Sequence, residues 1–216
     1  IPPPPIEDFI SILYRCSKER SLIEALRFQI HVCNHGLESY DFIVNPLVST
    51  FVSIGNTMCY ARQMFDKLLH HNDSCCNSLI CGYAKHKDGE EALVLYQQML
   101  HQQFNSSFQP STNTFVALLK VCAQTQDIGM GCKIHEDIVR KMGSVYDRDP
   151  FMGSALVGMY AKCGSLHKAE EVFDLLEVRN VVAWNSLISG YVGSGDNEKV
   201  LSFFYEMQYQ GISPDV

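Results

Sequence analysis

Short polar side chains recur through the sequence at a nearly constant spacing. Six similar segments each contribute one residue, and four of the six carry an amide or a hydroxyl group: Ile10, Asn45, Asn77, Val116, Ser154 and Asn185. Amides and hydroxyls can both donate and accept hydrogen bonds. Such a row can present one side chain to each base of an extended single strand of RNA. Helix capping is the alternative role, because Asn and Ser are common at helix N-termini.

Each residue of this row lies two positions before an apolar cluster with helical spacing. The cluster is a pair of apolar residues followed, three positions later, by an aromatic residue or Cys: Ile12-Leu13-Cys16, Leu47-Val48-Phe51, Leu79-Ile80-Tyr83, Leu118-Leu119-Cys122, Leu156-Val157-Tyr160 and Leu187-Ile188-Tyr191. Residues at i, i+1 and i+4 share one helical face, and the polar row points away from that face. The period of 31 to 39 residues predicts stacked repeats, because one short hairpin of helices cannot bury its apolar face alone.

A second helix in each repeat is predicted by apolar residues at i, i+3, i+4 and i+7. Four repeats carry this stripe: Ala61-Met64-Phe65-Leu68, Ala92-Leu95-Tyr96-Met99, Ala169-Val172-Phe173-Leu176 and Val200-Phe203-Phe204-Met207. Glycine-containing turns, such as 163–165 and 193–196, separate the two helices. We therefore expect an all-α fold, a right-handed α-solenoid of tandem helix-turn-helix repeats.

The composition limits the classes of partner. The formal net charge is −7 over 216 residues, which is unfavourable for binding phosphates and favours a protein partner unless the repeats separate their charges between two faces. The nine Cys residues include no C-x-x-C pair, so we expect reduced thiols and a reducing compartment. No apolar stretch approaches the ~20 residues that span a bilayer, and we expect no membrane contact.

Catalytic and metal-binding motifs are not found in the sequence. Zinc-dependent deamination uses H-x-E with P-C-x-x-C, and the pair His135-Glu136 has the wrong spacing. Neither of the glycine-rich phosphate-binding motifs occurs. One zinc candidate is disfavoured, because two of its Cys residues are adjacent and face different directions on a helix; it consists of His70, His71, Cys75, Cys76 and Cys81. We expect no enzymatic activity, no cofactor, no metal and no small-molecule substrate.

Several segments resemble the pentatricopeptide repeat family, specifically its plant subclass that alternates long (L), short (S) and ordinary (P) motifs. The segments are TFVALLKVCA (114–123), MYAKCGSL (159–166), NVVAWNSLISGY (180–191) and GISPD (211–215). Divided accordingly, the chain has an extended lead-in at 1–5 and six motifs: L 6–40, S 41–72, P 73–111, L 112–149, S 150–180 and P 181–215. The ending SPDV resembles the start of a further motif, so we expect a fragment of a longer protein.

The resemblance implies that the fifth and last residues of a motif together select one base. The fifth residues are the polar row described above. The pairs imply a cytidine reader at Asn45/Asn72, a looser pyrimidine reader favouring cytidine at Asn77/Ser111, an adenine reader at Ser154/Asn180 and a uridine reader at Asn185/Asp215. The pairs Ile10/Tyr40 and Val116/Asp149 match no code. The implied target is 5′-n-C-(C/U)-n-A-U-3′.

The resemblance also implies contacts outside the base-reading pairs. The second residue of a motif wedges bases apart, and Phe42, Phe151 and Val182 are apolar residues suited to that contact. Packing between repeats is the alternative role for the two Phe residues. Lys85 and Lys162 share the thirteenth motif position and are candidate phosphate contacts.

Two functions are compatible with these features. The resemblance implies a sequence-selective single-stranded RNA-binding module of a plant chloroplast or mitochondrion, acting in RNA processing and above all in C-to-U editing. Other organellar RNA-processing proteins are further expected partners. The alternative is a protein-interaction scaffold, which the acidic charge favours and the aligned Asn and Ser residues oppose.

Overall fold

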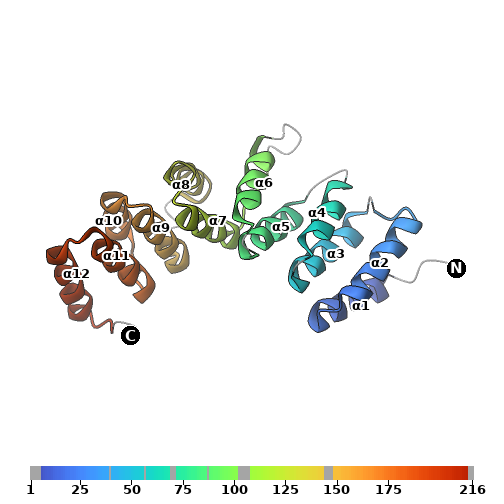
Figure 1. Cartoon of the computed structure of the whole chain (residues 1–216), viewed down its shortest axis with the longest axis horizontal. Helices are drawn as coiled ribbons and strands as arrows, with labels where there is room; N and C mark the ends of the chain where they lie inside the picture. Colours follow the sequence, from blue (N-terminus) through green and yellow to red (C-terminus); the bar gives the residue numbers. More distant parts are fainter. Residues whose placement is uncertain are drawn as a thin grey trace. The chain divides into compact units, whose positions relative to one another are not determined.

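The computed structural model describes residues 6–38, 40–55, 57–68, 72–86, 88–101, 108–143 and 148–213, with backbone only for 6–10 and 101. Within these ranges it contains twelve helices and no strand (Figure 1). The helices are α1 (Ile6–Glu19), α2 (Leu22–Asn34), α3 (Asp41–Ile54), α4 (Met58–Asp66), α5 (Asp73–Lys85), α6 (Gly89–His101), α7 (Thr112–Thr125), α8 (Ile128–Met142), α9 (Pro150–Lys162), α10 (Leu166–Leu175), α11 (Val181–Ser194) and α12 (Asn197–Tyr209). The predicted all-α repeat array is confirmed.

The chain divides into two compact units, residues 1–114 and 115–216, called here the first and second units. In the first unit, α1 packs on α3 and α3 on α5, while α2, α4 and α6 each pack on the helix that precedes them. The second unit repeats this arrangement, with α9 packing on α11 and with α10 and α12 on the helix before each. Odd-numbered helices therefore form one layer of each unit, and even-numbered helices form the other.

The apolar clusters of the sequence form the core of each unit. Leu47, Val48 and Phe51 of α3 are completely buried, and the equivalent Leu156 and Val157 of α9 are as well. The second-helix stripes that begin at residues 61, 92 and 169 are also buried. On α12 only Met207 of the stripe is buried, because no later helix of the described chain covers this side.

The odd-numbered helices begin at residues 6, 41, 73, 112, 150 and 181, where the predicted motifs begin. Four of the preceding residues cap these helices, since a side-chain oxygen accepts a hydrogen bond from a backbone N–H of the first turn: Asn72, Ser111, Asp149 and Asn180. Gly164 (φ 77°) lies in the turn after α9, and Gly195 (φ 78°) ends α11. Both positions need the left-handed backbone conformation that glycine adopts without strain.

The nine thiols are all free, and several are deeply buried. Burial raises the pKa of Cys75, Cys76 and Cys122 to about 12, so these groups stay protonated at neutral pH. His70 and His71, which completed the zinc candidate, lie outside the described residues. In the part of the chain that the structure describes, no helix has the length and apolar character required to cross a membrane.

Candidate nucleic-acid interface

A groove of about 410 Å³ lies on the odd-numbered helices of the second unit, where four predicted site residues meet: Phe151, Ser154, Lys162 and Val182. Ser154 lies in this groove with Phe151 on α9 and Val182 on α11. Val116 of α7, a fifth residue without an assigned code, lines the same groove. Ser154 is the fifth residue of its predicted motif. The fold places it beside Phe151, the second residue of the same motif, and Val182, the second residue of the next motif.

The two wedge candidates of this groove are exposed. Phe151 has 74% of its surface accessible and Val182 has 58%. The alternative that Phe151 packs between repeats is therefore wrong. Both side chains can contact the faces of a base inserted between them.

Ser154 is more enclosed than the sequence suggests. It is only 6% exposed, and its hydroxyl donates a hydrogen bond of 3.2 Å to the carbonyl oxygen of Phe151. Its last-residue partner Asn180 donates from Nδ2 to the carbonyl oxygen of Pro150 at 2.9 Å, which fixes Asn180 against the first turn of α9. Asn180 therefore both caps α11 and contacts the first turn of α9.

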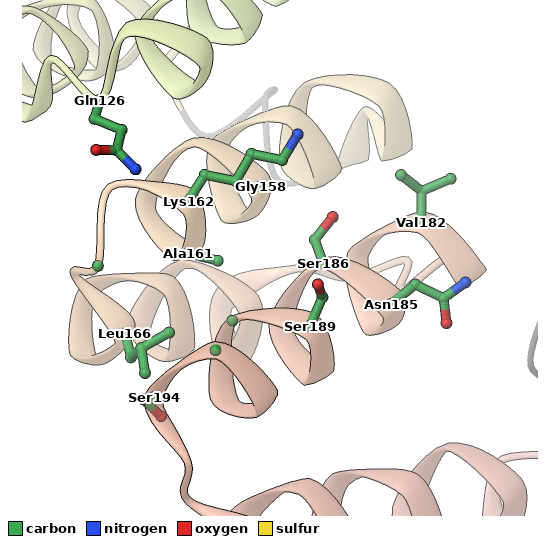
Figure 2. A pocket seen from close by; sticks show the side chains of 13 residues that line it. Gln126, Gly158, Ala161, Lys162, Leu166, Val182, Asn185, Ser186, Ser189 and Ser194 are labelled. Carbon is green, nitrogen blue, oxygen red and sulfur yellow. The ribbon is translucent and has the colours of Figure 1, made fainter.

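A second groove of about 730 Å³ adjoins the first, and Asn185 lines it. Figure 2 shows Val182 and Asn185 on α11, with the Ser186 hydroxyl directed toward Lys162 of α9. Lys162 lines both grooves, and the Asn185 amide has no hydrogen-bond partner among the described residues. Asp215, its predicted partner, lies outside those residues.

The carboxylates on the helices of the second unit are confined to its even-numbered layer. Lys120 and Lys162 line the 410 Å³ groove, and none of the residues that line either groove is acidic. Carboxylates instead occur on the even-numbered helices, where Glu170 of α10 pairs with Lys199 of α12 at 2.7 Å. The net charge of −7 is therefore not the charge of the groove, which is suited to phosphate contacts.

The first unit has a smaller groove of about 300 Å³, on α3 and α5. Lys85 lines it together with the hydroxyl groups of Ser49, Ser53 and Ser78. None of the base-reading candidates of this unit lies among its lining residues. The two phosphate candidates, Lys85 and Lys162, are thus both exposed on grooves of the odd-numbered helices.

The remaining candidates of the first unit have mixed surroundings. Phe42 is 49% exposed, so it is not a core residue, and its ring lies 5.7 Å from that of Tyr40. The Oδ1 atom of Asn45 is buried and has no hydrogen-bond partner among the described residues. Asn72 caps α5 through Cys75, at 2.8 Å.

Asn77 and Ser111, the predicted fifth and last residues of one motif, are in direct contact. The backbone N–H of Ser111 donates to Oδ1 of Asn77 at 3.0 Å. The contact uses hydrogen-bonding capacity that a free amide would offer to RNA. Two pairs match no code. In the pair Ile10/Tyr40, the side chain of Ile10 is not among the described ones, and in the pair Val116/Asp149, Asp149 caps α9.

Sequence reasoning missed several polar residues of these grooves: Lys120, Gln124, Gln126, Ser186 and Ser189. Ser186 and Ser189 lie on the same helical face as Val182 and Asn185, three or four residues away. One helical turn beyond Asn185 leads to Ser189, and one turn beyond Val182 leads to Ser186, so extending both predicted positions by a turn would have found them.

Comparisons with known proteins agree with this architecture. The PPR repeat family model matches residues 71–124 and 179–216, and a PPR repeat model matches residues 154–181. A chloroplastic pentatricopeptide repeat-containing protein of Arabidopsis thaliana is 34% identical over 211 residues, which are 97% of this chain and 38% of that protein. A mitochondrial relative from the same plant is 33% identical over 180 residues, covering 83% of this chain and 27% of the relative. The chain thus spans well under half the length of these relatives.

Solved structures of the pentatricopeptide repeat protein PPR10 share the fold. The structure of PPR10 from maize matches all of this chain and 31% of its own, with 16% identity and a TM-score of 0.67. PPR10 in complex with an 18-nt psaJ RNA element matches 98% of this chain and 31% of its own, with 17% identity and a TM-score of 0.75. Helix pairs, buried repeat signatures and family matches lead to one assignment: the chain belongs to the pentatricopeptide repeat family.

Proposed function

We propose that this chain is a sequence-selective, single-stranded RNA-binding module that contacts one nucleotide with each repeat. The proposed setting is a plant chloroplast or mitochondrion, since relatives carry the descriptions chloroplastic and mitochondrial. The proposed process is organellar RNA processing, with C-to-U editing as its specific form. A structural neighbour, PPR10, was solved with RNA, which supports RNA as the ligand class.

The 410 Å³ groove of the second unit is the observation that carries this proposal. It combines exposed Phe151 and Val182 with Ser154 between them, and two lysines without any carboxylate. Apolar surfaces on either side suit the faces of a base, and the lysines suit the phosphates beside it.

The proposed target keeps the base assignments made from the pairs. Asn45/Asn72 reads cytidine, Asn77/Ser111 a pyrimidine, Ser154/Asn180 adenine and Asn185/Asp215 uridine, giving 5′-n-C-(C/U)-n-A-U-3′. The L, S and P motif types and their boundaries are part of this proposal, because they set which residues form a pair.

The test is a titration of the chain against short RNAs with this target, and against scrambled RNAs of the same composition. Asn185→Ala removes an amide without a partner in the described structure, so it should weaken binding to the target by about tenfold. It should leave binding to RNAs that lack uridine at the sixth position nearly unchanged. An equal loss on every RNA would refute the base-reading assignment.

A protein-interaction scaffold is the second candidate. One observation favours it: Leu201, Tyr205 and Tyr209 are apolar or aromatic side chains exposed on α12. Binding of the target RNA no tighter than that of the scrambled RNA would support this candidate over the first.

A further inference from the structure

The side chain of Asn77 on α5 is held by three groups from the end of its repeat and the start of the next. Its Nδ2 atom donates to the carbonyl oxygen of Gln109 at 3.1 Å. Its Oδ1 atom accepts from the backbone N–H of Ser111 at 3.0 Å and from the hydroxyl of Thr114 at 2.7 Å. These partners lie 32 to 37 residues away in the sequence.

The chemistry of these partners fixes which way the amide faces. A backbone N–H can only donate and a backbone carbonyl can only accept, so rotating the amide by 180° would set donor against donor and acceptor against acceptor. The oxygen of Asn77 therefore faces Ser111 and Thr114, and its nitrogen faces Gln109.

The same reasoning assigns the hydroxyl protons. An amide oxygen only accepts, so the single hydroxyl proton of Thr114 goes to Asn77. The hydroxyls of Ser111 and Thr114 are 2.9 Å apart, and in this contact Ser111 must be the donor. Ser111 also accepts from the backbone N–H of Thr114 at 3.2 Å. Thr114 is fully buried, whereas Ser111 is exposed and Asn77 is half-buried, so a ligand can reach the pair but not Thr114.

Few hydrogen-bonding groups of the pair are left for a ligand. Both lone pairs of the Asn77 oxygen are occupied, and the Ser111 proton is committed to Thr114. What remains is the second N–H of Asn77, which has no partner among the described residues, and one lone pair on the Ser111 hydroxyl. The pair thus offers one donor, from the amide, and one acceptor, from the hydroxyl.

We infer that Thr114 is a specificity-determining residue for the third repeat, where it makes Asn77 a hydrogen-bond donor only. The inference rests on the proposed function. Cytosine suits this arrangement, because its ring nitrogen N3 accepts from the amide and its neighbouring amine donates to the hydroxyl. Uracil carries an N3–H at the same place, and the occupied oxygen of Asn77 cannot accept from it. Thr114 itself is buried and acts through Asn77, as a positioning residue.

Thr114→Val tests the role of the hydroxyl with little change of shape. The substitution returns one lone pair to the Asn77 oxygen and releases the Ser111 proton, so the pair could then also bind uracil. Thr114→Ser keeps the hydroxyl and should behave as the unchanged chain. Thr125→Val is the matched control on α7, because the Thr125 hydroxyl only donates to carbonyl oxygens of its own helix, such as that of Val121 at 3.1 Å.

The measurement is the dissociation constant of the full chain for two RNAs that differ only in cytidine or uridine at the third target position. The unchanged chain, Thr114→Ser and Thr125→Val should prefer cytidine by about tenfold. Thr114→Val should bring the two RNAs to within about threefold of each other. An unchanged preference in Thr114→Val, or an equal loss in Thr114→Ser, would overturn the inference.

A second RNA pair, which differs only at the fifth position read by Ser154/Asn180, separates two kinds of failure. Discrimination at the fifth position without any at the third would refute the role of Thr114 and leave the proposed function standing. Loss of discrimination at both positions would refute the proposed function and this inference with it.

Discussion

Asn77 in the first unit and Asn185 in the second are the same residue type at the same predicted motif position, yet their side chains are used differently. Asn77 makes three hydrogen bonds within the chain, while Asn185 makes none with the described residues and lines an open groove. The difference shows that residue type sets how many hydrogen bonds are possible, whereas neighbouring residues decide how many remain for a ligand.

The wedge candidates of the two units differ in the same way. Phe42 lies beside the ring of Tyr40, and Phe151 stands exposed on a groove with Val182 opposite. The 410 Å³ groove of the second unit brings together a second residue, a fifth residue and lysines, whereas the 300 Å³ groove of the first unit is lined by Lys85 without a second or a fifth residue. We therefore expect the second unit to contribute more to RNA affinity and sequence selectivity.

The largest expected effect is that of Phe151→Ala on RNA binding. Stacking of one base on an aromatic side chain contributes about 1–3 kcal/mol, so the dissociation constant should rise about tenfold to a hundredfold. Phe42→Ala is the matched variant in the first unit and should cost less. Fluorescence anisotropy with labelled target RNA measures both, and equal losses would erase the proposed difference between the units.

The next effect concerns stability and separates the two Asn residues. Asn77→Ala leaves the Thr114 hydroxyl and the Ser111 N–H without their acceptor, so the free energy of unfolding should fall by about 1–2 kcal/mol. Asn185→Ala breaks no hydrogen bond of the described structure and should change it by less than about 0.5 kcal/mol. Urea denaturation followed by circular dichroism compares them, and similar losses would contradict the assigned networks.

A smaller effect is expected when the groove loses one cation. Lys162→Ala should weaken binding equally for all sequences and reduce the slope of log affinity against log salt by about 0.7. Lys168→Ala is the control, because Lys168 lies on α10 and contacts Cys132 at 3.3 Å, away from both large grooves. A sequence-dependent loss in Lys162→Ala would show that this lysine contacts a base.

The smallest effect is expected on the even-numbered helices, at Glu170. Partial burial raises its pKa, but hydrogen bonds from Lys199 and Tyr191 outweigh this, and the net pKa lies below the ordinary 4.5. Its contribution to stability is therefore present at neutral pH and lost as pH falls below 4.5.

Glu170→Gln should remove the part of the free energy of unfolding that is lost as pH falls. This part is below about 1 kcal/mol because Lys199 is solvent-exposed. Thermal unfolding between pH 7 and pH 3 measures the change, while RNA affinity should stay constant. A change in RNA affinity at neutral pH would contradict the separation of the two layers.

Most of the fold follows from local patterns that the sequence displays. The clusters around Leu47 and Leu156 predicted buried faces because helical periodicity depends only on neighbours in the chain. The hydrogen bonds of Asn77 could not be predicted, since they depend on residues more than 30 positions away. The basic groove could not be predicted from the net charge either, because the net charge is a sum over both layers and does not show where Lys120 lies.

Repeat-by-repeat base reading is the central claim, and the variant Asp215→Asn tests it most directly. The resemblance implies that this single change converts the Asn185/Asp215 pair from a uridine reader into a cytidine reader. Titration of both proteins against RNAs ending in A-U and A-C should show a preference that moves from uridine to cytidine at the sixth position alone. Binding that is indifferent to the last base in both proteins, or a shift at another position, would contradict the proposed register of repeats on RNA.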